Sequence, residues 1–196
     1  MARNIYTISN IKDLTNKLRN IQDINKRRLY LVGLLTKEIK TKKNKPVIVG
    51  GCALEFYTTG GYSTGDIDII FPDNKLLDKV LRKWGFIKEG RHWINDELDM
   101  YIESPGSVLK GDDPSKVTKI RVENVDAYVI GVEDLIIDRL NATVHWHSSD
   151  DRYWAKELIY IHRDMLDMDY IRKRALEEGT ADELENILKE ISHENA

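Results

Sequence analysis

The fold is decided between residues 47 and 71, which read Val47-Ile-Val-Gly-Gly-Cys-Ala-Leu-Glu-Phe-Tyr-Thr-Thr-Gly-Gly-Tyr-Ser-Thr-Gly-Asp-Ile-Asp-Ile-Ile-Phe71. This order predicts an apolar strand, a double-glycine turn, a short helix, a second glycine turn and a second strand. Because strand side chains alternate between two faces, Asp66 and Asp68 are expected on the same face. Two neighbouring carboxylates repel each other unless a cation lies between them, and such oxygen ligands suit Mg²⁺ together with substrate phosphates. The segment therefore predicts a site for a metal and a nucleotide.

The rest of the chain alternates strand and helix patterns and then becomes wholly helical. We expect an α/β (α+β) fold, a nucleotide-binding mixed sheet flanked by helices. Its parts would be an N-terminal helical segment (1–24), a core (25–130) and a C-terminal helical region (131–196). Strands are expected at Val47–Val49, Asp66–Phe71, Phe86–Ile94, Glu97–Glu103, Val117–Val122 and Ala127–Ile130; helices are expected within residues 8–42 and at Cys52–Tyr57, Asn74–Trp84, Glu133–Thr143, Asp150–His162, Asp169–Glu178 and Ala181–Ile191.

Composition limits the classes of protein. With 196 residues, 41% of them hydrophobic, the chain can form one domain with a helical appendage. A net charge of -3 gives no overall attraction to nucleic acid. The basic run 37–45 is either a solvated helix end or a local contact for RNA or another acceptor. The single Cys52 excludes an intramolecular disulfide and a thiolate-rich zinc site, and we expect it in the core. No stretch approaches about 20 apolar residues, so we expect a soluble, cytoplasmic protein without a membrane partner.

A third carboxylate would complete a site for two cations. Asp99 stands between Leu98 and Met100 in the strand expected at Glu97–Glu103, and it is the leading candidate. Glu97 and Glu103 are the alternatives on the same segment. If this strand lies beside the strand of Asp66 and Asp68, two cations could hold a triphosphate and activate an acceptor hydroxyl.

Together these motifs resemble the nucleotidyltransferase superfamily that includes polymerase beta, the tRNA CCA-adding enzymes and the AbiEii-type toxins, and especially its small uncharacterised prokaryotic members. The resemblance extends over roughly residues 25–195 and includes the later segment 132–142 followed by Asp150-Asp151. Departures are Ala53-Leu54, where CCA-adding enzymes have Arg-Asp, and a Gly-Gly turn in place of Gly-Ser. The motifs that carry the resemblance are Gly50-Gly51, Thr64, Asp66-Ile67-Asp68 and Leu98-Asp99-Met100.

The resemblance implies a role for each of these residues. Asp66, Asp68 and Asp99 would bind metal and act in catalysis, with Asp99 also accepting the proton of the attacking hydroxyl. Gly50 and Gly51 would let backbone N–H groups approach the phosphates. Thr64 would belong to the nucleotide site. Arg139 would contact the triphosphate, unless it forms a helix salt bridge with Asp138 or Glu133.

The leading hypothesis is a Mg²⁺-dependent enzyme that moves a nucleoside monophosphate from an NTP to a hydroxyl of an RNA, tRNA, protein or small-molecule acceptor, with a toxin as one form. The main alternative is a non-catalytic antitoxin or regulatory partner, in which the helical tail docks to another protein of a toxin–antitoxin pair. A lesser alternative is an aminoglycoside-type nucleotidyltransferase. His145 and His147 could also indicate a transition-metal site, but a place at a helix end is favoured over it.

Overall fold

The computed structural model describes residues 11–39, 44–109 and 114–194. The chain forms two compact units. The first, here called the sheet unit, contains residues 1–110 and 117–129. The second, the helical unit, contains residues 111–116 and 130–196. Each unit is described by itself.

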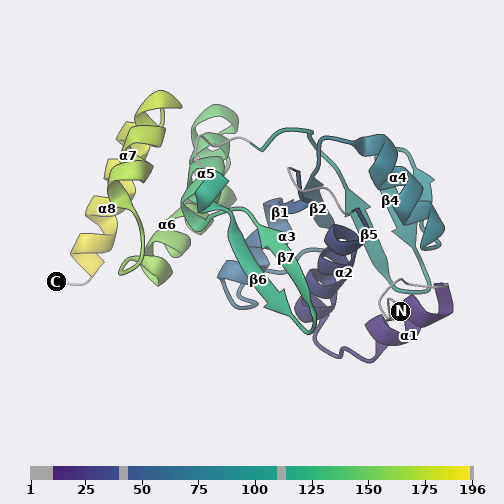
Figure 1. Ribbon diagram of the computed structural model, residues 1–196. Coiled ribbons are helices and arrows are strands. Elements are labelled where there is room, and N and C mark those ends of the chain that lie inside the picture. Colours follow the sequence, from purple (N-terminus) through teal and green to yellow (C-terminus); the bar gives the residue numbers. More distant parts are fainter. Residues whose placement is uncertain (1–10, 40–43, 110–113, 195–196) are drawn as a thin grey trace. The chain divides into compact units, whose positions relative to one another are not determined.

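A mixed sheet of seven strands forms the sheet unit, in the order β3-β4-β5-β2-β1-β7-β6 (Figure 1). Neighbouring strands are antiparallel except for two parallel pairs, β1 with β7 and β2 with β5. The expected α/β fold with a mixed sheet is therefore confirmed. The strands are β1 (Val47–Val49), β2 (Ile67–Ile70), β3 (Ile87–Glu89), β4 (His92–Asn95), β5 (Met100–Glu103), β6 (Thr118–Val122) and β7 (Val125–Val129).

One set of alternating strand side chains is buried and holds the helices on the sheet. Ile67 and Ile69 of β2 are at most 1% exposed, whereas Asp68 between them is half-buried. Helix α2 packs against β7 and also contacts α3 and α4. Burial of this apolar surface is the main source of stability for such a layer. The helices of the unit are α1 (Ile11–Arg19), α2 (Ile24–Ile39), α3 (Gly50–Tyr57) and α4 (Asn74–Lys83).

The segment from residue 86 to residue 103 differs from its prediction. The expected single strand Phe86–Ile94 is the β3–β4 hairpin, which turns at Gly90-Arg91. Gly90 has a φ of +57°, a conformation that glycine adopts without steric cost, and this permits a two-residue turn. The next strand, β5, begins only at Met100, so residues 97–99 belong to the turn before it.

Short connections join the four main helices of the helical unit. The side chain of Ser148 caps α6 by accepting a hydrogen bond from the Asp151 N–H, and Asp167 caps α7 in the same way through the Tyr170 N–H. Gly179, with a φ of +73°, separates α7 from α8. The elements are η1 (Pro114–Lys116), α5 (Val132–Trp146), α6 (Ser149–His162), α7 (Met168–Glu177) and α8 (Ala181–Glu194).

The core of the helical unit is built from apolar residues of its helices, which are therefore not available as a docking surface for a partner. Leu135, Ile136, Leu158 and Ile159 are at most 3% exposed, so they pack inside the unit. Ile161 is 48% exposed and lies outside this core. Within the described ranges, no helix is long and apolar enough to cross a membrane.

Candidate metal and nucleotide site

Three neighbouring strands place acidic and imidazole side chains in one row across the sheet. Asp68 of β2 is the register partner of Glu103 in the parallel strand β5, and Glu103 is in turn opposite His92 of the antiparallel strand β4. Cross-strand partners project from the same face of a sheet. Asp66 precedes β2 by one residue, and a carboxylate oxygen of Asp66 lies within 4.8 Å of ligand atoms of both His92 and Glu103. The row therefore places Asp68, Glu103 and His92 on one face of the sheet, with the Asp66 carboxylate close to His92 and Glu103.

Polar neighbours hold two of these carboxylates. The Thr64 hydroxyl donates a hydrogen bond of 2.8 Å to Asp66 Oδ1. Glu103 Oε2 lies 3.2 Å from His92 Nε2 and 3.3 Å from Arg91 Nε. Asp66 and Asp68 are half-buried, whereas Glu103 is only 8% exposed. The group is thus partly shielded from water and still open on one side.

The double-glycine turn lies directly against these residues. Gly50 has a φ of +58°, and a Cβ at this position would stand 2.3 Å from Asp68 Oδ2. A Cβ on Gly51 would stand 2.9 Å from the Thr64 hydroxyl oxygen. Only glycine permits this approach, so the Asp68 carboxylate lies beside the first turn of α3. The N-cap of α3 is Val49, whose side chain offers no capping hydrogen bond.

Arg28 of α2 is a buried support that the sequence patterns did not reveal. Its Nη1 forms a 2.5 Å ion pair with Glu55 of α3, and its Nη2 donates a 2.7 Å hydrogen bond to the Thr64 carbonyl. Arg28 thereby ties two helices to the loop whose Thr64 hydroxyl holds Asp66. Arg28 directly follows Lys26 and Arg27 in the sequence, so nothing there distinguishes it from an exposed basic residue. An arginine that is buried requires a partner, and only the tertiary structure supplies it.

Cys52 lies in α3 close to the site and does not have the properties of a nucleophile. Burial raises the pKa of its thiol to about 12, with smaller contributions in the same direction from Glu55, Asp68 and Asp66 and an opposing contribution from Arg28. A thiol with such a pKa stays protonated near neutral pH. The expectation that Cys52 is a core residue is confirmed by its 4% exposure.

Asp99 does not occupy the place expected for it. It lies in the turn before β5, is exposed and has a φ of +52°. Asp68 is in register with Glu103, and Asp99 lies four residues before Glu103 in the sequence. The expected strand Glu97–Glu103 was wrong at its start, because β5 begins at Met100. Glu103, one of the two alternatives for the third carboxylate, is the residue that adjoins Asp68, and metal binding by any of these residues stays a prediction.

Residues 27–192 match the family described as nucleotidyltransferase of unknown function (DUF6036). The chain belongs to this family. A solved structure similar to it is an antigenic nucleotidyltransferase-like protein from Paracoccidioides brasiliensis, with a TM-score of 0.51 and 12% sequence identity, covering 83% of this chain and 92% of that one. At this identity the likeness shows the fold alone. No curated protein matches the chain. The nucleotidyltransferase resemblance is therefore confirmed, while likeness to AbiEii-type toxins stays a prediction.

The remaining predicted site residue, Arg139, belongs to the helical unit of this nucleotidyltransferase-family chain. Its guanidinium forms ion pairs with Asp151 at 2.6 Å and with Asp138 at 2.5 Å. The Asp138 pair is one of the helix salt bridges considered as an alternative to a triphosphate contact. His145 and His147 stand at the end of α5, where His147 is the C-cap with a φ of +56°. This is the helix-end location that was favoured for them.

The basic run 37–45 lies partly outside the described residues, since positions 40–43 are not among them. Lys45 is described, and its Nζ lies 2.6 Å from the Tyr128 hydroxyl and 4.2 Å from the centre of the Tyr128 ring. Lys45 is thus held against β7. A contact between this run and RNA stays a prediction.

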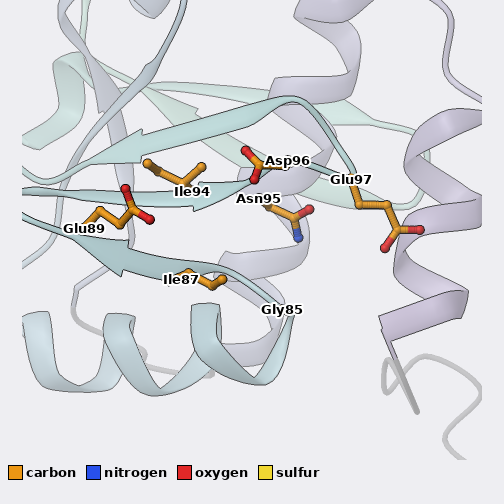
Figure 2. Close-up of a pocket in the computed structure, with 7 residues that line it drawn as sticks. All are labelled: Gly85, Ile87, Glu89, Ile94, Asn95, Asp96 and Glu97. Carbon is orange, nitrogen blue, oxygen red and sulfur yellow. The ribbon is translucent and has the colours of Figure 1, made fainter.

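A hollow of about 340 Å³ is lined by residues of the β3–β4 hairpin and of the turn that follows β4 (Figure 2). None of its lining residues is basic or a nucleophile, and none belongs to the group of Asp66, Asp68 and Glu103. Its composition does not favour binding of a polyphosphate. The lining residues are Gly85, Ile87, Glu89, Ile94, Asn95, Asp96 and Glu97.

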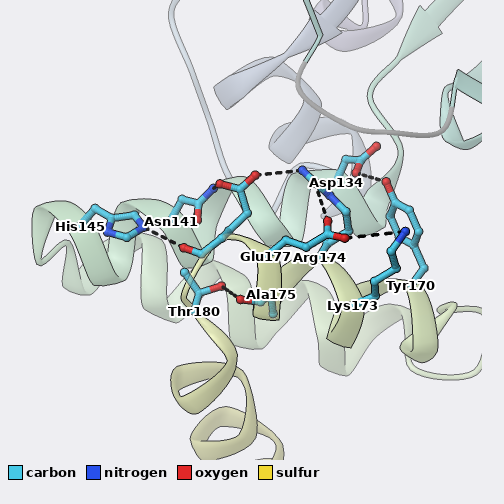
Figure 3. A network of polar contacts seen from close by, with 10 residues as sticks. Asp134, Asn141, His145, Tyr170, Lys173, Arg174, Ala175, Glu177 and Thr180 are labelled. Carbon is cyan, nitrogen blue, oxygen red and sulfur yellow. Dashed lines mark hydrogen bonds and ion pairs between the residues drawn. The ribbon is translucent and has the colours of Figure 1, made fainter.

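Charged side chains in the helical unit form a second polar group, but its members pair with one another (Figure 3). Arg174 binds Glu177 at 3.1 Å and Glu178 at 3.0 Å, and Tyr170 donates a 2.6 Å hydrogen bond to Asp134. Burial raises the pKa of Asp134, while the Tyr170 hydroxyl and the Arg174 charge oppose that shift. The Tyr170–Asp134 hydrogen bond joins α7 to α5, and the Arg174 ion pairs lie within α7 and its C-cap, so the group serves the packing of these helices.

Proposed function

We propose that the sheet unit carries a divalent-metal-dependent nucleotidyltransferase that moves a nucleoside monophosphate from an NTP to an acceptor hydroxyl and releases pyrophosphate. One observation carries the proposal: Asp68 and Glu103 are register partners on adjoining strands, with Asp66 beside them and the Gly50-Gly51 turn against Asp68. Family membership supports the same class of reaction. The proposal assigns to Glu103 the role of third carboxylate that the sequence predicted for Asp99.

The donor set fits a hard divalent cation. Asp66, Asp68 and Glu103 offer carboxylate oxygens, which are the ligands that Mg²⁺ prefers. Their negative charges stand close together in a partly buried place, where a cation lowers their mutual repulsion. Mg²⁺ is the expected ion on this basis, and these three residues would hold it.

The start of α3 fits the triphosphate. The first N–H groups of a helix have no partner inside the helix, and Val49 cannot supply a side-chain cap. The partial positive charge of the helix N-terminus favours phosphate, and Gly50 and Gly51 have no side chain that would block it. Thr64, whose hydroxyl lies beside Gly51, borders the same space.

In the proposed reaction the acceptor oxygen attacks the α-phosphorus of the NTP. A bond forms between that oxygen and the α-phosphorus, the bond from the α-phosphorus to the oxygen that bridges to the β-phosphate breaks, and pyrophosphate leaves. Glu103 takes the hydroxyl proton, while Gly50 and Gly51 position the phosphates. Bound metal would supply neutralisation of the phosphate charge and activation of the nucleophile. Most of the rate enhancement in such chemistry comes from positioning and electrostatics.

The acceptor is an RNA, tRNA, protein or small molecule bearing a hydroxyl. A toxin that modifies a cellular RNA or protein is one form of this proposal. Expression of the chain in a bacterial host tests it: growth arrest that is relieved by Asp68→Asn supports an enzymatic toxin. Arrest that persists in the Asp68→Asn variant contradicts an enzymatic toxin.

The reaction is tested by incubating the protein with each of the four NTPs, labelled at the α-phosphate, and with divalent metal and cell extract. Label should become attached to an acceptor with wild-type protein and be lost with Asp66→Ala and Asp68→Ala. Asp138→Ala, an exposed aspartate of the helical unit, is the matched control and should label normally. Equal labelling by wild type and both site variants contradicts the proposal. Absence of NTP binding in calorimetry favours instead the non-catalytic antitoxin or regulatory role.

A further inference from the structure

His92 extends the carboxylate row by one strand. Glu103 Oε2 lies 3.2 Å from His92 Nε2, and the ligand atoms of Asp66, His92 and Glu103 all lie within 4.8 Å of one another. The sheet register fixes the backbones of His92 in β4 and Glu103 in β5, and Asp66 directly precedes β2, which pairs with β5. The His92 side chain is 32% exposed, which leaves its ring accessible from solvent.

These separations are close to those of a metal coordination shell. In an octahedron with bonds of about 2.1 Å, neighbouring ligand atoms stand roughly 3.0 Å apart and opposite ones roughly 4.2 Å apart. The 3.2 Å between His92 Nε2 and Glu103 Oε2 matches a pair of neighbouring ligand atoms. A pair of ligand atoms at the 4.8 Å limit would reach the separation of opposite ligands after a small rotation of one side chain. A simple ion pair between His92 and Glu103 involves two members of the group, and the third, Asp66, is held near them by the Thr64 hydroxyl.

Arg91 is the competitor for the same carboxylate. Its Nε lies 3.3 Å from Glu103 Oε2, but its side chain is 75% exposed. An exposed pair of this kind contributes little free energy, so a divalent ion can displace the guanidinium. Arg91 does not prevent metal binding at this place.

We propose that His92 Nε2 is a ligand of the divalent ion held by Asp66 and Glu103, and that this imidazole gives the site a preference for Mn²⁺ over Mg²⁺. Mg²⁺ binds oxygen ligands and gives up its waters reluctantly, whereas imidazole suits transition metals. The inference deepens the proposed function, because it names the ion for the same carboxylates. It concerns binding, however, and holds or fails whether or not nucleotide transfer is observed.

The direct test is the pulsed electron paramagnetic resonance spectrum of the wild-type protein with one equivalent of Mn²⁺ and no nucleotide. Electron spin echo envelope modulation detects a ¹⁴N nucleus that is bonded to Mn²⁺. We expect a coupling typical of a bound imidazole nitrogen, which His92→Gln removes and His193→Gln keeps. His193 is an exposed histidine of the helical unit, so it is the matched control. Bound Mn²⁺ without a ¹⁴N coupling in the wild-type protein overturns the proposal.

Calorimetric titration gives an independent measurement on the same variants. We expect His92→Gln to weaken Mn²⁺ binding at least about tenfold, since loss of even an outer partner of a metal ligand costs about that much. Mg²⁺ binding should change by less than about twofold, because Mg²⁺ makes little use of imidazole. Equal losses for the two ions overturn the proposed preference. Circular dichroism of each variant, and His92→Asn as a second substitution, separate loss of a ligand from loss of the fold.

The outcomes also separate this inference from the proposed function. A ¹⁴N coupling without nucleotide transfer supports the metal site and contradicts the enzyme. A different result supports the enzyme and overturns the role of His92. In that case the rate of nucleotide transfer falls in Asp68→Asn but not in His92→Gln, and the wild-type protein binds Mn²⁺ without a ¹⁴N coupling.

Discussion

The two units of the chain place their charged residues in contrasting ways. In the helical unit, Arg174 pairs with Glu177 and Glu178, and the buried Asp134 receives a hydrogen bond from Tyr170. In the sheet unit, carboxylates of Asp66, Asp68 and Glu103 gather on one face of adjoining strands. In the helical unit these contacts join helices, whereas in the sheet unit the acidic side chains form a candidate site at which a cation would lower their mutual repulsion.

The largest expected effect is on the one buried ion pair that supports the site. In Arg28→Met, the Glu55 carboxylate, whose side chain is 6% exposed, would lose its partner. We expect a loss of about 3–5 kcal/mol in the free energy of unfolding, measured by chemical denaturation. Arg174→Met should cost less, because the side chains of Glu177 and Glu178 are 40% and 30% exposed and can turn to water.

A double substitution checks the reason for that loss. Arg28→Met with Glu55→Met removes both charges, so it should be more stable than Arg28→Met alone. The same or lower stability in the double variant would show that the buried charge is not the cause. A greater loss in Arg174→Met than in Arg28→Met would contradict the expectation that a less exposed carboxylate depends more on its partner.

The next effect distinguishes the two candidates for the third carboxylate. Glu103→Gln should lower the rate of nucleotide transfer at least about 100-fold, because it removes both a ligand of the proposed metal ion and the acceptor of the hydroxyl proton. Asp99→Asn, in the exposed turn, should stay within about threefold of wild type. Steady-state kinetics with α-labelled NTP measures both. The reverse order of effects would return the role to Asp99.

A smaller effect is expected at the glycine turn. Gly50→Ala would combine the cost of a positive φ with a contact of 2.3 Å to Asp68, and we expect a loss of about 2–3 kcal/mol in the free energy of unfolding. Gly60→Ala is the matched control, since Gly60 also has a positive φ, of +86°, but has no atom within 4 Å of the new Cβ. It should lose about 1 kcal/mol. Equal losses would mean that Asp68 does not lie against the turn.

The smallest effect is expected in the helical unit. Tyr170→Phe deletes the hydroxyl that donates to Asp134, and we expect a loss of about 1 kcal/mol in thermal or chemical unfolding. The pKa of Asp134 should rise further, because the hydrogen bond opposes the effect of burial. Tyr160→Phe, at a side chain that is 41% exposed, should be neutral. A destabilised Tyr160→Phe would show that the assay does not report on the Asp134 contact.

The motif between residues 47 and 71 made the fold and much of the site predictable, because its glycines and aspartates act locally. Strand alternation was sufficient to place Asp66 and Asp68 on one face. The glycines were assigned to phosphate, and the structure adds a steric reason, since Gly50 also makes room for Asp68.

The place of Glu103 beside Asp68 could not be predicted, because it depends on where β5 begins and on its register with β2. Apolar neighbours on both sides made Asp99 look like a strand residue, yet β5 starts after it. His92 and Arg28 were missed for related reasons. His92 stood inside an expected long strand whose turn at Gly90 went unrecognised, and Arg28 reaches Glu55 only through tertiary packing.

The most direct test of the account is a crystal structure of the protein with Mn²⁺ and a nonhydrolysable NTP, using the anomalous signal to locate the ion. We expect a peak within about 2.5 Å of carboxylate oxygens of Asp68 and Glu103, with the triphosphate along the first turn of α3. An ion bound at Asp99, or a triphosphate bound away from Gly50 and Gly51, would contradict it.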